Sequence, residues 1–268
     1  MTGPAVEVEH HDHAVAWVWL NRPDSRNALV PDLVAELTDA VRRVGDDPRT
    51  RVLVLAGRGS AFSAGGDLTS LRAMADETYH RNLLDSQVLS RLFQSLDECP
   101  CPVVARVQGP ALGGGTGLAA CADVVVASES ARFGCTEVRV GIIPAVIAPY
   151  LLDKLGPSAA RRHLISGERL TAAQARAAGL VHEVVAPERL DPAVAAVVAE
   201  LLAGDGAAQR AIKRLLPLLR SAPSRDAAVA LATQESARVR VSEPARRGID
   251  AALDRLSQRR RDSDRRKE

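Results

Sequence analysis

Apolar positions in the first two thirds of the chain follow two patterns in turn. Residues 51–56, 103–107 and 124–127 are almost continuously apolar, which is typical of strands buried on both faces of a parallel sheet. Strands that alternate with helices need crossover connections, so the pattern predicts an α/β fold. The first helix is indicated by apolar residues at helical spacing, namely Val30, Leu33, Val34, Leu37, Val41 and Val44. Further strands are expected at residues 15–20 and 181–185, and further helices at residues 78–98 and 145–155.

The pattern changes near residue 192. Strand signals are absent beyond this point, and the end of the chain, residues 259–268, is a run of charges that we expect to be solvated. The sequence therefore predicts two parts, an α/β core at residues 1–191 and a helical region at residues 192–268. Helices are expected in that region near residues 192–203, 207–220, 225–240 and 244–260.

The composition is that of an ordinary globular protein. The chain has 268 residues, 46% of them hydrophobic and 25% charged, and no apolar run approaches the roughly 20 residues that span a bilayer. A net charge of +2 and seven aromatic residues give little basis for a nucleic-acid partner. The polar and acidic start lacks the features of a secretory signal, so we expect a cytoplasmic protein without a membrane partner.

The cysteines and histidines do not form a metal-ligand pattern. The four cysteines include no paired C-x-x-C motifs, and few histidines lie near them in the sequence. We expect the cysteines to be reduced and mostly buried. His10, His11 and His13 cluster near the start, where a solvated strand edge is a better interpretation than a metal site.

Two loops rich in small residues carry the candidate chemistry. Residues 55–68 and residues 107–118 each combine an apolar strand, several glycines and a following helix. Glycine lets the backbone approach a ligand closely, and a helix start offers unpaired N–H groups and a positive dipole end. Two such loops can each aim one N–H group at the same developing oxyanion.

Other loop chemistries fit these residues less well. The dinucleotide-binding fingerprint fails because Phe62 follows Gly57 and Gly59, and neither loop contains the lysine of a phosphate-binding Walker loop. A nucleophile elbow around Ser63 has Ala61 in place of its first glycine. Two tight turns without a ligand are the remaining alternative for either loop taken alone.

Six separated motifs, in order along residues 6–190, resemble the crotonase (enoyl-CoA hydratase/isomerase) superfamily, and in particular bacterial members of the methylglutaconyl-CoA hydratase type. They are Asn21-Arg-Pro with Asn27-Ala-Leu29, Ala61-Phe-Ser-Ala-Gly-Gly-Asp-Leu68, Pro102-Val-Val-Ala with Gly109 and Gly113-Gly-Gly115, Cys121-Ala-Asp123, Phe133-Gly134 with Glu137 and Gly141-Ile-Ile-Pro144, and Ala172 through Val181. The resemblance implies a ββα superhelix followed by C-terminal helices that join subunits, in a trimer or a dimer of trimers. A monomer by light scattering would contradict this expectation.

The resemblance also implies an acyl-CoA site. The two N–H donors of the family's oxyanion hole correspond to Gly66 and Gly114, and one of its catalytic glutamates corresponds to Glu137. Asp67 and Asp123 are expected to bond to backbone N–H groups at loop ends. No cofactor or metal is implied beyond the CoA that the substrate carries. The remaining positions expected to contact the substrate or its CoA are Arg22, Arg26, Ala28, Ala64, Asp67, Leu68, Thr69 and Gly117.

Gly117 departs from the family pattern, because two-glutamate hydratases carry their second glutamate there. A small residue at this position would open room for a branched or carboxylated acyl group. Hydration of a short or branched 2-enoyl-CoA is the leading hypothesis. The alternative is a 3,2-enoyl-CoA isomerase, for which one carboxylate suffices to move a proton between two carbons. A non-catalytic protein that binds acyl-CoA, or RNA through its basic tail, is the third.

Overall fold

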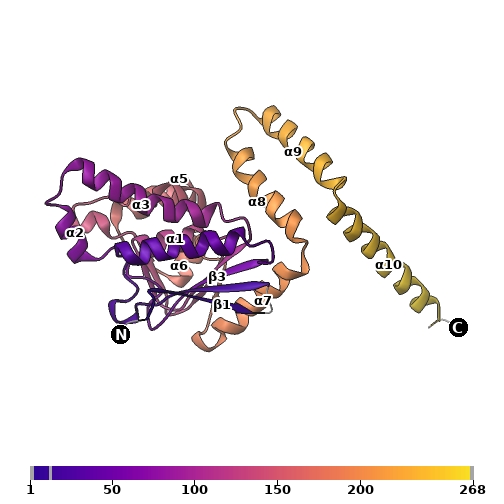
Figure 1. Cartoon of the computed structure of the whole chain (residues 1–268), viewed down its shortest axis with the longest axis horizontal. Helices are drawn as coiled ribbons and strands as arrows, with labels where there is room; N and C mark the ends of the chain where they lie inside the picture. Colours follow the sequence, from indigo (N-terminus) through magenta and orange to yellow (C-terminus); the bar gives the residue numbers. More distant parts are fainter. Residues whose placement is uncertain (1–2, 12–13, 266–268) are drawn as a thin grey trace. The chain divides into compact units, whose positions relative to one another are not determined.

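The computed structural model describes residues 3–11 and 14–265 (Figure 1). The chain divides into two compact units, Met1–Leu201 and Leu202–Glu268. The predicted division lay at residue 191/192. The division falls later because the buried side chains of Leu190, Val194 and Val198 pack α7 (Leu190–Ala203) into the first unit. An ion pair between Arg106 and Asp191 joins the start of this helix to the sheet.

The first unit is built on a six-stranded sheet. The strand order is β1-β2-β3-β4-β6-β9, in which β1 pairs antiparallel with β2 and all other pairs are parallel. The strands expected from the apolar runs are confirmed, and the last of them is shorter than expected. The bounds are β1 (Val6–His11), β2 (Val15–Leu20), β3 (Val52–Gly57), β4 (Val103–Val107), β6 (Val124–Ser128) and β9 (Glu183–Val185).

Two of the histidines near the start of the chain lie on the edge strand β1. His10 and His11 lie at the exposed end of β1, which confirms the expected solvated strand edge, and His13 lies outside the described residues. Within the part of the chain that the structure describes, no group of three or more His, Cys, Asp and Glu residues is arranged to hold a metal ion. None of the described helices is long and apolar enough to cross a membrane.

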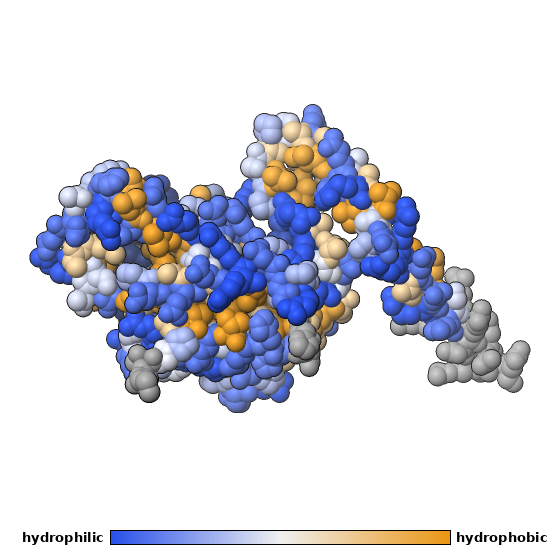
Figure 2. Space-filling view, viewed as in Figure 1, coloured by the Kyte–Doolittle hydropathy of each residue, from blue (hydrophilic) through white to orange (hydrophobic). Residues whose placement is uncertain are grey.

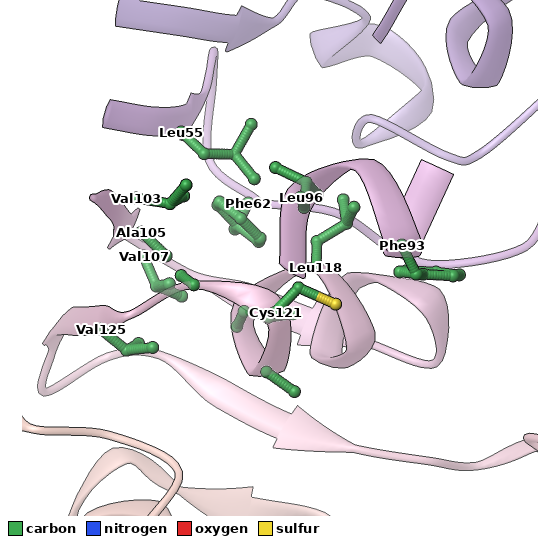
Figure 3. Close-up of a cluster of buried hydrophobic side chains, with 14 of the residues drawn as sticks. Leu55, Phe62, Phe93, Leu96, Val103, Ala105, Val107, Leu118, Cys121 and Val125 are labelled. Atoms are coloured by element: carbon green, nitrogen blue, oxygen red, sulfur yellow. The ribbon is translucent and has the colours of Figure 1, made fainter. Parts of the chain in front are cut away.

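Helices cover one face of the sheet and form the core with it. α1 (Pro31–Asp46) packs against β1 and β2. α3 (Tyr79–Asp97) lies beside α1 (Figure 1) and also contacts α4 (Gly114–Cys121). Apolar spacing buries one side of α1 completely, and Pro31 suits its first turn. Figure 3 shows Leu55 and Val103 of the strands, and Phe62 of the first glycine-rich loop, beside side chains of α3 and α4, among them Phe93, Leu96 and Leu118.

A second, smaller sheet was not predicted, because its strands are only two or three residues long. It has the order β5-β7-β8, from β5 (Pro110–Leu112), β7 (Arg132–Gly134) and β8 (Leu170–Thr171). β5 and β7 are parallel, and this pairing brings the end of the second glycine-rich loop beside the segment that leads to Glu137.

α5 (Ala148–Ser166) consists of two helical stretches that meet at a kink. Gly156, at φ +71° and ψ 166°, is not helical, so the first stretch ends near residue 155, as the sequence predicts, and a second stretch that was not predicted begins with Pro157. The other connections are η1 (Pro23–Ser25), α2 (Leu68–Met74), η2 (Glu137–Val140), α6 (Ala172–Ala177) and η3 (Pro187–Arg189).

Both predicted loop-end aspartates bond to backbone N–H groups. The N–H of Ser70 donates to Asp67 at 2.8 Å, so Asp67 caps α2. The N–H of Val103 donates to Asp123 at 2.7 Å, at the start of β4. The four cysteines are buried, as expected, and the sulfur atoms of Cys99 and Cys101 lie 3.7 Å apart.

The second unit is entirely helical in its described part, as predicted. It contains α8 (Gly206–Arg220), α9 (Arg225–Arg240) and α10 (Glu243–Arg265), and α8 packs against α9. Large apolar side chains remain exposed on these helices, and Figure 2 shows hydrophobic residues at their surface. They include Ile212, Leu216, Val229, Ile249, Leu253 and Leu256.

Asn27 holds the first glycine-rich loop against the segment before α1. Its side chain is fully buried, and its backbone adopts φ +54°, which Asn tolerates better than most residues. Nδ2 donates to the carbonyl oxygens of Arg58, Ala61 and Phe62 at 3.0 to 3.1 Å, and Oδ1 accepts from the N–H of Arg22. One side chain therefore satisfies four backbone groups.

Asn27→Ala is expected to lower the free energy of unfolding by about 2–4 kcal/mol, because it leaves buried backbone groups without partners. Urea denaturation of both proteins measures the change. Asn82→Ala is the control, since Asn82 also donates to backbone carbonyls but is less buried. An equal decrease in the free energy of unfolding in the two variants would contradict a larger contribution from the buried Asn27.

Candidate active site

The two glycine-rich loops lie side by side. Residues 58–67 form the first glycine loop and residues 108–113 the second. The N–H of Ser63 donates to Pro110 at 3.1 Å, and the N–H of Leu112 donates to Ser63 at 3.0 Å, in a parallel bridge between Ser63 and Ala111. Gly65, at φ +82°, touches the second loop so closely that a Cβ there would lie 2.3 Å from the Leu112 carbonyl oxygen. Only glycine fits this contact.

This approach brings the predicted oxyanion glycines together. The Cβ position of Gly65 lies 3.2 Å from the nitrogen of Gly114, and Gly66 is the next residue along the first loop. Gly114 is the first residue of α4, where N–H groups have no partner within the helix. Among the described residues, neither Gly66 nor Gly114 donates a hydrogen bond from its N–H. Two free donors from two loops thus lie close together beside a helix start.

Glu137 lies beside these donors. It begins η2, and its Oε1 is 2.8 Å from the position that a Cβ on Gly113 would take. Its Oε2 is buried and has no hydrogen-bond partner in the described chain, and burial raises the pKa of this carboxyl above its ordinary value. A half-buried carboxyl with one oxygen left without a partner is suited to exchange a proton with a bound molecule.

The neighbouring thiol is not a candidate nucleophile. Burial, and then the negative charge of Glu137, raise the pKa of the Cys135 thiol, so it stays protonated at neutral pH.

Thr116 connects the oxyanion side of the site to the carboxyl side. It is 2% exposed in the first turns of α4, and its Oγ1 donates to the carbonyl oxygen of Ala111 at 2.6 Å. The same oxygen accepts from the N–H of Gly134 at 3.0 Å, and the N–H of Gly113 donates to the carbonyl of Gly134 at 2.8 Å. These bonds join the start of α4 to the strand that leads to Glu137. Sequence reasoning missed this residue, because its role appears only once β5 and β7 are paired.

Comparison with known proteins identifies the family of this chain. The family model described as Enoyl-CoA hydratase/isomerase matches residues 10–254. The chain belongs to this family. The family is one of enzymes, and its solved members share the crotonase fold of this chain.

Relatives and solved structures agree with this assignment. The chain is 37% identical to a crotonyl-CoA hydratase of Syntrophomonas wolfei over 194 residues, which cover 71% of this chain and 73% of that one. It is 39% identical to a 2,3-dehydroadipyl-CoA hydratase of Escherichia coli over 166 residues, 62% of this chain and 63% of that one. The crystal structure of an enoyl-CoA hydratase of Mycobacterium smegmatis superposes with a TM-score of 0.89 at 31% identity, covering 94% of this chain and 97% of that one.

Most positions expected to contact CoA border the first glycine loop. Leu68 is 68% exposed and Thr69 is exposed in the first turn of α2, and Ala64 is half-buried, with its N–H donating to Arg26. Arg26 is exposed and adopts φ +53°. The CoA role of these residues stays a prediction.

Arg22 and Ala28 occupy different surroundings in this segment. Arg22 has a buried Nη1 without a partner in the described chain. Hydrogen bonds from Ser70, and more weakly the charge of Arg22, lower the pKa of Asp67, so Arg22 lies near Asp67. Ala28 is buried, and its N–H and C=O bond to Ser25 and Val30, so it offers a substrate little surface.

Position 117 corrects one expectation. A small residue there was expected to open room for a branched or carboxylated acyl group, but the space is already filled. A Cβ on Gly117 would lie 2.3 Å from Cγ2 of Ile147 and 3.0 Å from Cε1 of Phe93. Both side chains are buried. The family's second glutamate is therefore replaced by apolar packing from two other elements, which the sequence pattern at residue 117 could not reveal.

Thr116→Val is expected to lower the free energy of unfolding by about 1–3 kcal/mol, since it keeps the shape but leaves two buried backbone groups unpaired. Thr116→Ser keeps the hydroxyl and serves as the matched control. Urea denaturation gives the stability, and the turnover number of each variant shows whether the link also matters for the site. Equal behaviour of the valine and serine variants would contradict the role of the hydroxyl.

Proposed function

We propose that this protein is an enoyl-CoA hydratase that adds water across the C2–C3 double bond of a short or branched 2-enoyl-CoA thioester. The observation that carries the proposal is the position of the half-buried Glu137 carboxyl, whose Oε2 has no hydrogen-bond partner in the described chain, beside the N–H groups of Gly66 and Gly114. Relatives named as hydratases support it.

The two N–H groups stabilise charge on the thioester oxygen. When water adds at C3, the electron pair of the double bond moves toward the thioester carbonyl, which becomes an enolate oxyanion. Hydrogen bonds from Gly66 and Gly114 strengthen as this charge develops, and the helix dipole of α4 acts in the same direction. Removal of one such donor typically costs about 3–4 kcal/mol of transition-state stabilisation.

Glu137 moves the proton. Its carboxylate accepts a proton from water as the water oxygen bonds to C3. The resulting carboxyl then delivers a proton to C2 while the carbonyl re-forms, so that one water is added and Glu137 returns to its starting state. Burial favours the protonated form of this carboxyl and thereby favours the first step, in which the carboxylate takes a proton from water. One carboxyl that serves both carbons adds H and OH to the same face of the double bond.

A 3,2-enoyl-CoA isomerase is the second candidate. The apolar packing at Gly117 favours it, because no second carboxylate occupies that position to hold water. Glu137 would then remove a proton from C2 of a 3-enoyl-CoA and return it at C4 through the same oxyanion. Family membership among enzymes sets aside the non-catalytic acyl-CoA- or RNA-binding alternative.

The same proposal covers the partners. The acyl-CoA thioester supplies the only CoA required, and the reaction needs no metal or further cofactor, since a carboxyl and two N–H groups suffice for each step. A homotrimer or dimer of trimers is proposed, and its support is the set of exposed apolar side chains on α8, α9 and α10.

Glu137→Gln is expected to lower turnover by at least about a hundredfold, the usual range for loss of an acid–base group, while acyl-CoA binding changes little. Crotonyl-CoA in deuterated water, followed by mass spectrometry and NMR, is the assay. The wild type is expected to add one water and to place one deuterium at C2. Glu188→Gln, at an exposed position, is the control and should keep wild-type activity.

The products separate the candidates. Migration of the double bond in a 3-enoyl-CoA without water addition would replace the hydratase by the isomerase. Retained turnover in the Glu137→Gln variant would contradict both.

A further inference from the structure

The residues at the start of α4 place Ile147 next to the reacting centre. The N–H of Gly117 donates to the carbonyl of Gly113 at 3.1 Å, so Gly117 lies one turn after Gly113, the N-cap of α4. The Cβ position of Gly113 touches the Glu137 carboxyl, and that of Gly117 touches Ile147 and Phe93. The catalytic carboxyl and these two apolar side chains therefore occupy neighbouring positions along α4.

The local sequence alone does not account for Ile147. It precedes α5 with helical backbone angles, φ −95° and ψ −12°, and the N–H of Ala148 after it already donates to Pro144 at 3.0 Å, so the side chain of Ile147 does not cap the helix. The side chain is 3% exposed and packs onto α4 instead. Ile147 therefore contributes through its packing against α4 and not by capping α5.

The surroundings of Ile147 are apolar. The three atoms nearest to the Cβ position of Gly117 are all carbons, and Cδ1 of Leu29 lies 2.5 Å from the Cβ position of Gly114. The ring of Tyr150 tilts against Phe93, with ring centres 6.1 Å apart.

We propose that Ile147 is a specificity-determining residue, which together with Phe93 forms an apolar wall beside the reacting carbons and selects short, uncharged acyl groups. This inference rests on the proposed function. Long chains are excluded because the wall occupies the space one helical turn from Glu137. Chains that end in a carboxylate are excluded because burying that charge against carbon atoms, without a partner, is unfavourable.

The test compares Ile147→Ala with the wild type on 2-enoyl-CoA substrates of four, six and eight carbons and on 3-methylglutaconyl-CoA. The variant is expected to raise kcat/KM for the eight-carbon substrate, relative to crotonyl-CoA, by about tenfold or more. Ile165→Ala is the control, because Ile165 lies on the same helix but is 64% exposed. Ile147→Val removes one methylene group, so a smaller rise in the same kcat/KM ratio is expected. If the alanine variant does not fold, the valine variant tests the role of Ile147.

Binding separates this inference from the proposed reaction. Calorimetry with butyryl-CoA and octanoyl-CoA measures the same preference without turnover. If the wild type adds no water but the Ile147 variants still shift affinity toward octanoyl-CoA, the wall is supported and the hydratase is not. Unchanged ratios in folded Ile147 variants, by either assay, would overturn the role of Ile147. Failure of the wild type to bind any acyl-CoA would overturn both proposals.

Discussion

The backbone pairing of the two glycine loops is the constraint on which the site depends. β3 and β4 are parallel neighbours, so both strands end at the same edge of the sheet and deliver their loops together. The loops continue this parallel pairing through Ser63 and Ala111. Gly65 then allows an approach that any side chain would prevent. This contact brings the N–H groups of Gly66 and Gly114 close together.

Two further links hold this contact in place. Asn27 bonds to the first loop through three carbonyl oxygens, and Thr116 joins the second loop and α4 to β7. The unsatisfied groups of the site are confined within this frame. In the described chain they include the N–H groups of Gly66 and Gly114 and Oε2 of Glu137, and each lowers the stability of the protein without a ligand. A bound thioester that accepts the two hydrogen bonds would recover part of that cost.

Much of this could be predicted from the sequence. Continuous apolar runs identified the buried parallel strands, and the glycines identified both loops, whereas Glu137 was indicated only by the resemblance of the ordered motifs to the family. The short strands β5, β7 and β8 could not be predicted, because two or three residues carry no detectable period. The Gly-Pro pair at residues 156 and 157 ends the predicted helix, and only the second helical stretch of α5 beyond it was not predicted. The packing at Gly117 depends on Ile147 and Phe93, which are distant in sequence. The glycine alone therefore indicates open space where the structure has apolar packing.

The most direct test of this account compares two substitutions of Gly66. A Cβ at this position would lie 3.4 Å from Leu71, an ordinary contact, so Gly66→Ala keeps both the loop and the N–H. Gly66→Pro removes the N–H, which makes no hydrogen bond within the described chain. If that N–H stabilises the oxyanion, kcat for crotonyl-CoA should fall about 10²–10³-fold in the proline variant and change little in the alanine variant. Equal activity of two folded variants would contradict the oxyanion site.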